Sequence, residues 1–168
     1  IREALQADPE LRLSVSSTTR APREGEQDGR DYHFISREEF ERMIEAKQFL
    51  EWARVYDNYY GTALHNVEQI LKDGHHAVLD IDTQGAMHIK GMARGAVVIF
   101  ITPPSLEALE ERLRDRRTET DESFQPRMAR AEHEMSFRDQ YDYVVSNDHI
   151  RDAVQQFRRI IDAEKKRP

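Results

Sequence analysis

The sequence predicts an α/β protein with a buried parallel sheet. Two short segments rich in β-branched residues, 77–81 and 97–101, are separated by a segment with helical spacing, which is the order of a β-α-β unit. A mixed segment with more strand signals, from about residue 19 to residue 64, interrupts this pattern. A chain of 168 residues is long enough for one such core with an inserted subdomain.

Local signals predict further elements in the N-terminal half. A short helical segment at 1–6 precedes a segment at 11–15 in which apolar and polar residues alternate. Ser36 and Glu39 have the spacing of a capping box, which predicts a helix that begins there.

The remaining elements are also marked by caps and stops. Residues 66–72 predict a helix, and Gly74 is its expected C-terminal stop. The C-terminal half then predicts, in order, a helix capped by Ser105, a helix at 121–138, a strand at 143–145 and a final helix capped by Asp148.

Composition excludes several classes of protein. The longest apolar runs, such as 96–101, have the length of a strand, so we expect no membrane association. A net charge of −7 and a pI near 5.5 argue against a general nucleic-acid binder. The absence of cysteine excludes disulfides and fits a reducing compartment, and no secretory signal opens the chain, so we expect a cytoplasmic protein.

A run of hydroxyl side chains closed by two arginines is the first candidate site. Residues 14–23 read SVSSTTRAPR, with Arg20 and Arg23 three positions apart. Guanidinium groups pair with phosphate oxygens bidentately, and hydroxyls fill the remaining lone pairs, so the segment favours a small phosphorylated ligand. The alternative for this segment alone is a polar surface turn.

Two acids follow the predicted strand at 77–81. Asp80 and Asp82 lie two residues apart, so we expect them on one face at the carboxyl edge of the sheet, where open α/β sheets bind ligands. Acids there need partners, which favours a functional role over a structural one. Metal ligation and nucleotide binding both fit, and the sequence leaves their division open.

Four separated motifs together resemble the guanylate kinases: SVSSTTRAPR at 14–23, EGEQDGRDYHF at 24–34, NYYGT at 58–62 and LDIDTQG at 79–85. The resemblance implies a P-loop NTPase-like parallel-sheet core with an inserted mixed α/β subdomain that binds GMP and a helical lid. The implied boundaries are 1–18, 65–109 and 129–168 for the core, 19–64 for the GMP-binding insert and 110–128 for the lid.

The resemblance also implies the chemistry. A guanylate kinase phosphorylates GMP, and by analogy dGMP, to the diphosphate with ATP as donor and Mg²⁺ as the accompanying ion, within purine nucleotide metabolism. The expected partners are GMP or dGMP and ATP, and no nucleic acid. We expect no metal site built from protein side chains, because the adjacent His75 and His76 cannot both face one ion without another close ligand.

A guanine pocket needs a carboxylate beside a hydroxyl. Guanine presents N–H donors next to an acceptor oxygen, and an ionised carboxylate only accepts hydrogen bonds. By resemblance Glu51 accepts from the base, with Ser16 and Thr62 supplying hydroxyls. The complete GMP site implied by the resemblance is Ser16, Arg20, Arg23, Tyr32, Glu51, Tyr60, Thr62, Asp80 and Asp82.

Alternation separates the two neighbouring tyrosines. In an extended NYYGT segment, Tyr59 and Tyr60 point to opposite sides, so only one can face the ligand. The family pattern assigns the phosphate to Tyr60, which leaves Tyr59 as a packing residue.

Arginines are the expected catalytic groups, because phosphoryl transfer requires cations around the transferred group. The resemblance assigns this role to Arg20, Arg112, Arg116 and Arg127. Arg112 and Arg116, with Asn147 in SNDH at 146–149, would contact the donor nucleotide. We expect Arg114 and Arg130 to form ordinary pairs within their helices.

The chain contains no GxxxxGK[ST] motif, although a P-loop would precede the helix that begins at Ile1. We expect the sequence to be part of a longer protein whose preceding segment supplies the first strand and the P-loop. The alternative is a catalytically inactive, guanylate-kinase-like module that binds phosphorylated peptides.

Overall fold

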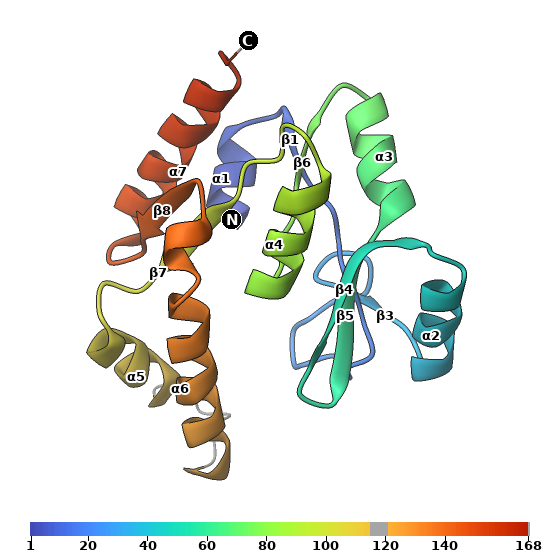
Figure 1. Ribbon diagram of the computed structural model, residues 1–168, viewed down its shortest axis with the longest axis horizontal. Coiled ribbons are helices and arrows are strands. Elements are labelled where there is room, and N and C mark those ends of the chain that lie inside the picture. Colours follow the sequence, from blue (N-terminus) through green and yellow to red (C-terminus); the bar gives the residue numbers. More distant parts are fainter. Residues whose placement is uncertain (115–120, 168) are drawn as a thin grey trace. The chain divides into compact units, whose positions relative to one another are not determined.

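The computed structural model describes residues 1–114 and 121–167. The chain divides into two compact units, Ile1–Arg94 and Gly95–Pro168 (Figure 1).

A four-stranded sheet dominates the first unit. Its spatial order is β3-β2-β5-β4, and the strands are β2 (Ser17–Thr18), β3 (His33–Phe34), β4 (Phe49–Val55) and β5 (Asn58–Ala63). β4 and β5 form an antiparallel hairpin, and β2 pairs antiparallel with β5 and parallel with β3. The segment predicted as a mixed insert therefore contains most of this sheet.

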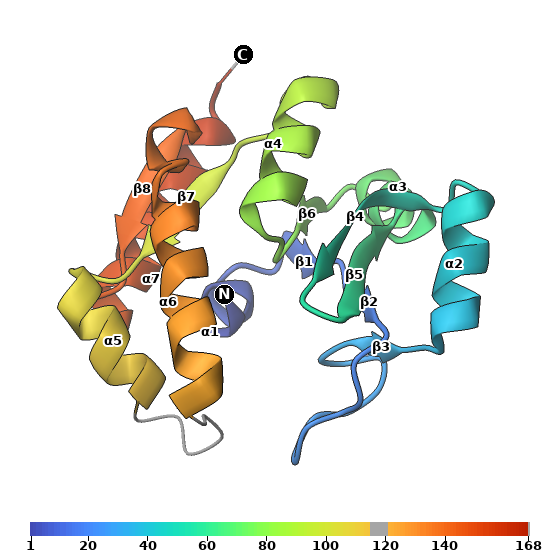
Figure 2. The same cartoon turned by 60° about the horizontal axis from the view of Figure 1, so that its bottom comes forward.

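Helix α2 (Arg37–Glu45) lies beside the hairpin (Figure 2). It packs on the hairpin through Phe40. Phe40 is fully buried, and its ring stacks on Phe49 at 4.3 Å and on Tyr59 at 5.2 Å between centroids. The helix begins as predicted, because the side chain of Ser36 accepts a hydrogen bond from the Glu39 backbone N–H at 3.1 Å. A local cap and one buried aromatic residue thus fix this element.

The rest of the first unit surrounds a pair of parallel strands, β1 (Leu11–Leu13) and β6 (His76–Val78). Its helices are α1 (Arg2–Ala7), α3 (Leu64–Lys72) and α4 (Thr83–Met92). α3 ends as predicted at Gly74, whose φ of +80° lies in the left-handed region that favours glycine.

One prediction in this unit is wrong. Asp80 and Asp82 do not share a strand face, because β6 already ends at Val78. Asp82 is instead the N-cap of α4, where its side chain accepts from the Gly85 N–H at 3.0 Å. β6 ends where its partner strand does, because Leu13, the last residue of β1, pairs with Val78.

The second unit contains the parallel pair β7 (Ile99–Thr102) and β8 (Tyr143–Ser146). Val145 on β8 forms a buried cluster with Ala153 and Ile160. The latter two lie on α7, and the helical elements of this unit are α5 (Leu106–Arg114), α6 (Asp121–Met135), the 3₁₀ helix η1 (Arg138–Gln140) and α7 (Ile150–Glu164).

The predicted caps of this unit are right in one case and wrong in the other. Ser105 caps α5, since its hydroxyl accepts from the Ala108 N–H at 3.1 Å. The N-cap of α7 is His149 rather than Asp148, and His149 makes no side-chain capping bond. Among the described residues, no helix combines the length and the apolar character that a bilayer crossing requires.

Substitution of Ser36 tests whether its side chain caps α2. Ser36→Ala removes the side-chain acceptor and should lower the free energy of unfolding by about 1 kcal/mol. Ser36→Asp retains an acceptor and should lose much less. Urea unfolding of the wild type and both variants measures these changes, and equal losses in Ala and Asp would contradict the capping role.

Candidate active site

A buried acid and a hydroxyl face each other across the β4–β5 hairpin. The strand register sets Glu51 opposite Thr62, and the Thr62 hydroxyl donates to Oε1 of Glu51 at 2.5 Å. Glu51 is 7% exposed and Thr62 is fully buried. The structure therefore brings together the carboxylate and hydroxyl that the sequence predicts as a base-recognition pair.

The surroundings of Glu51 raise its pKa. Burial is the main cause, and the negative charge of Asp82 adds to it, whereas the Thr62 hydrogen bond and His88 act in the opposite direction. Burial therefore makes the ionised carboxylate costly, although Thr62 donates to it. A ligand that presents N–H groups would offset part of this cost.

Arg20 is the centre of a second cluster in the same unit. Its Nε donates to the Tyr60 hydroxyl at 3.2 Å, and its two Nη atoms contact the two carboxylate oxygens of Glu26 at 2.9 and 3.0 Å. The guanidinium carbon also lies 5.5 Å from the centre of the Tyr32 ring. This bidentate pair with Glu26 raises the pKa of Arg20 and lowers the pKa of Glu26.

The two tyrosines of this cluster are neighbours. The rings of Tyr32 and Tyr60 meet edge to face at 5.9 Å, and burial, followed by the charge of Asp80, raises the pKa of Tyr32. Tyr59 points to the other side and stacks on Phe40, as alternation predicts. The cluster thus provides one guanidinium and two phenols, a suitable set of donors for a phosphate.

Glu26 is a functional candidate that the sequence reasoning missed. Besides Arg20, it accepts from the backbone N–H of Arg23 at 2.7 Å, so it links both arginines of the SVSSTTRAPR motif. An acid three residues after Arg23 was the available signal. Its partner could not be identified, because the intervening chain forms an irregular turn.

Three further residues predicted for the GMP site differ in how exposed they are. Arg23 is exposed, and Ser16 is half-buried with its carbonyl accepting from the His33 N–H at 2.9 Å. Asp80 is exposed.

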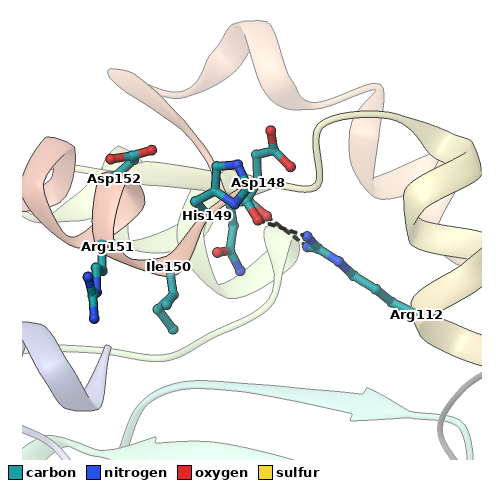
Figure 3. A pocket seen from close by; sticks show the side chains of 7 residues that line it. Arg112, Asp148, His149, Ile150, Arg151 and Asp152 are labelled. Carbon is teal, nitrogen blue, oxygen red and sulfur yellow. Dashed lines mark hydrogen bonds between the residues drawn. The ribbon is translucent and has the colours of Figure 1, made fainter.

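The second unit holds a pocket of about 580 Å³ at the start of α7 (Figure 3). Arg112 reaches from α5 toward the loop before α7, and its Nη atoms donate to the carbonyls of Asn147 at 2.8 Å and Asp148 at 3.3 Å. The pocket is lined by Arg112, Asn147, Asp148, His149, Ile150, Arg151 and Asp152. The structure thus brings together Arg112 and Asn147, both predicted to contact the donor.

Two further arginines were predicted to be catalytic, and two others to form ordinary pairs within their helices. Arg127 lies half-buried in α6, and Arg116 lies outside the described residues. Arg114 pairs with Glu110 and Arg130 pairs with Glu134, each at 2.8 Å and four residues apart, as the sequence predicts.

Comparison with known proteins places this geometry in a family. The guanylate kinase family model matches residues 3–164. The chain belongs to the guanylate kinase family.

Individual guanylate kinases are similar along nearly the whole chain. The guanylate kinase of Rickettsia bellii is 49% identical over 163 residues, which cover 97% of this chain and 85% of that protein. The guanylate kinase of Caldanaerobacter subterraneus subsp. tengcongensis is 48% identical and is covered to 78%. The crystal structure of guanylate kinase from Anaplasma phagocytophilum superposes with a TM-score of 0.84 at 36% identity, covering 99% of this chain and 80% of that one.

These similarities confirm the predicted α/β fold class, with its P-loop NTPase-like parallel sheet, for this guanylate kinase family chain. They give no support to the alternative of an inactive phosphopeptide-binding module.

The raised pKa of Glu51 predicts a pH dependence of GMP binding. If the ionised carboxylate accepts from guanine, affinity should fall as the pH decreases through this raised pKa, and the loss should begin at a higher pH than for an ordinary glutamate. Glu51→Gln should remove this dependence and lower the preference for GMP over AMP by about tenfold or more, because a charged hydrogen bond contributes roughly 1.5–3 kcal/mol. Calorimetric titration at several pH values measures both effects, and an unchanged preference would contradict the assignment.

Glu26 provides an independent prediction for the phosphate cluster. Glu26→Gln removes the bidentate partner of Arg20 and should weaken GMP binding about fivefold, the scale of a partly exposed ion pair. Glu24→Gln is the matched control, since Glu24 is an exposed acid in the same turn. Equal affinities of the two variants would show that Glu26 does not position Arg20.

Proposed function

We propose that this chain catalyses the ATP-dependent phosphorylation of GMP, and of dGMP, to the corresponding diphosphate. The observation that carries the proposal is the buried Glu51–Thr62 pair in the same compact unit as the Arg20–Tyr60–Tyr32 cluster. The pair would recognise a base with N–H donors, and the cluster would hold a monophosphate. Membership of the guanylate kinase family supports the same assignment.

Base selection would depend on the hydrogen-bonding groups along one edge of the purine base. The N–H groups of guanine would donate to the Glu51 carboxylate, while Ser16 and Thr62 offer hydroxyls beside it. Adenine presents an acceptor nitrogen at this edge, which the carboxylate repels. A wrong base would also leave the buried acid without donors, which increases the discrimination.

The acceptor phosphate would be held by Arg20, Arg23, Tyr32 and Tyr60. Both Nη atoms of Arg20 contact Glu26, whereas its Nε–H group points toward the Tyr60 hydroxyl. Asp80 and Asp82 complete the proposed GMP site. Asp82 would act through its place beside Glu51, and Asp80 through its place near Tyr32.

The reaction itself needs positioning and positive charge. A phosphate monoester is already anionic at neutral pH, so no general base is required. An acceptor oxygen would attack the γ-phosphorus of ATP in line, the bond to the β-phosphate oxygen would break, and ADP would leave with that electron pair. Arg20, Arg112, Arg116 and Arg127 would offset the charge of the transferred group, with Arg112, Arg116 and Asn147 contacting the donor.

We propose Mg²⁺ as the ion that accompanies ATP. Within the described part of the chain there is no group of three or more acidic or histidine side chains that could hold a metal. Mg²⁺ commonly binds through substrate phosphates and water with few protein ligands, so the residues present fit an ion carried by ATP. Bound there, it would neutralise charge on the phosphates.

The remaining assignments are part of the same proposal. Residues 19–64 would form the GMP-binding subdomain, 110–128 the lid, and the rest the core. The lack of cysteine supports a cytoplasmic location, and the net charge of −7 argues against a nucleic-acid partner.

A coupled assay of ADP formation in the full-length protein tests this function. With ATP and Mg²⁺, GMP and dGMP should be phosphorylated, and AMP and CMP should give rates near background. Absence of transfer to GMP, together with binding of a phosphotyrosine or phosphoserine peptide, would overturn the proposal in favour of an interaction module.

A further inference from the structure

Gly85 occupies a position where the backbone does not require glycine. It lies in the first turn of α4, and its φ is outside the left-handed region, unlike that of Gly74. Glycine within a helix is less favourable than alanine, because it loses more backbone entropy on folding. A reason for glycine must therefore come from what lies next to its Cα.

The neighbour of Gly85 is the carboxylate of Glu51. A Cβ placed on Gly85 would lie 2.6 Å from Oε2 and 3.2 Å from Cδ of Glu51. The first of these distances is well inside van der Waals contact, so even an alanine methyl group requires the carboxylate to move. Glu51 cannot move freely, because Oε1 accepts from Thr62 and the side chain is buried.

The two carboxylate oxygens are thus fixed in different ways. Thr62 holds Oε1 by a hydrogen bond, and the bare Cα of Gly85 provides the space that Oε2 occupies. The first turn of α4 also favours an anion through its backbone N–H groups. Asp82 and His88, whose charges act on Glu51 in opposite directions, belong to the same helix or its cap.

We propose that Gly85 is a positioning residue for guanine selectivity, which sets the orientation of the Glu51 carboxylate by having no side chain. This inference rests on the proposed function, because it assigns Glu51 to the base. It adds a second element, α4, to a recognition pair that otherwise belongs to the β4–β5 hairpin alone.

Two glycines of one helix provide a matched pair of variants. Gly85→Ala should raise the Kd for GMP about tenfold and reduce the preference for GMP over AMP by a similar factor, the scale of one disturbed charged hydrogen bond. Gly91→Ala should bind GMP like the wild type, since a Cβ there meets no atom within 4 Å. Both gain helix propensity, so a general effect of alanine in α4 would appear in both.

A pH profile separates positioning from structural damage. In Gly85→Ala, the displaced carboxylate should titrate with a shifted apparent pKa in GMP binding, whereas Gly91→Ala should keep the wild-type profile. The full-length protein is titrated with GMP and AMP by calorimetry. Wild-type affinity, preference and pH profile in Gly85→Ala would overturn the inference.

A double variant keeps the test decisive if Gly85→Ala folds poorly. Glu51→Ala removes the two nearest atoms that a Cβ would meet and leaves the Cβ of Ile81 at 3.4 Å, an ordinary van der Waals distance. Gly85→Ala should therefore raise the thermal unfolding midpoint in that background, because alanine has the higher helix propensity. A lower midpoint in the Glu51→Ala background would show that Gly85 acts independently of Glu51 and would overturn the inference. Failure of the wild type to bind GMP would refute the proposed function itself, which distinguishes the two outcomes.

Discussion

The register of the β4–β5 hairpin determines which side chains can form the site. It sets Glu51 opposite Thr62 and turns Tyr60 toward Arg20. On the other side of β5, Tyr59 stacks on Phe40, and a Cβ on Gly61 would lie 2.9 Å from the Phe49 ring. Because side chains alternate along a strand, a slip of one residue would bury the ligand-facing groups against α2 and expose the packing groups. Aromatic packing on Phe40 therefore also fixes the chemistry of the opposite face.

The two clusters of this unit differ in how their charges are satisfied. Arg20 has an acidic partner in Glu26, so its positive charge is paired before a phosphate is bound. Glu51 is buried beside an acidic neighbour, and this raises its pKa although Thr62 donates to it. Desolvation of this carboxylate destabilises the ligand-free site, and a ligand with N–H donors removes part of that cost. If Glu51 binds the base, selectivity would already be set in the unliganded protein, since a base without donors leaves the cost in place.

Local signals in the sequence predicted the parts of the structure that depend on a few neighbouring residues. The Ser36 cap, the Gly74 stop and the opposite directions of Tyr59 and Tyr60 follow from rules of helix ends and strand alternation. The N-cap of α7 could not be predicted as well, because Asp148 and His149 compete within one turn and the side-chain signal favours the wrong one. Sequence could suggest Glu51 and Thr62 only through the family resemblance, since their pairing depends on the hairpin register.

Contacts that depend on tertiary packing could not be predicted from the sequence. Glu26 reaches Arg20 only because an irregular turn folds back, and Gly85 meets Glu51 only because α4 packs against β4. Both contacts fix a charged side chain from outside its own strand or turn. Every described residue that we assign to GMP lies within the first unit, whereas Arg112 and Asn147 lie in the second. On this assignment, the packing of one unit would determine the choice of acceptor base, and substitutions at Glu51 or beside it should change that choice without touching the residues assigned to the donor.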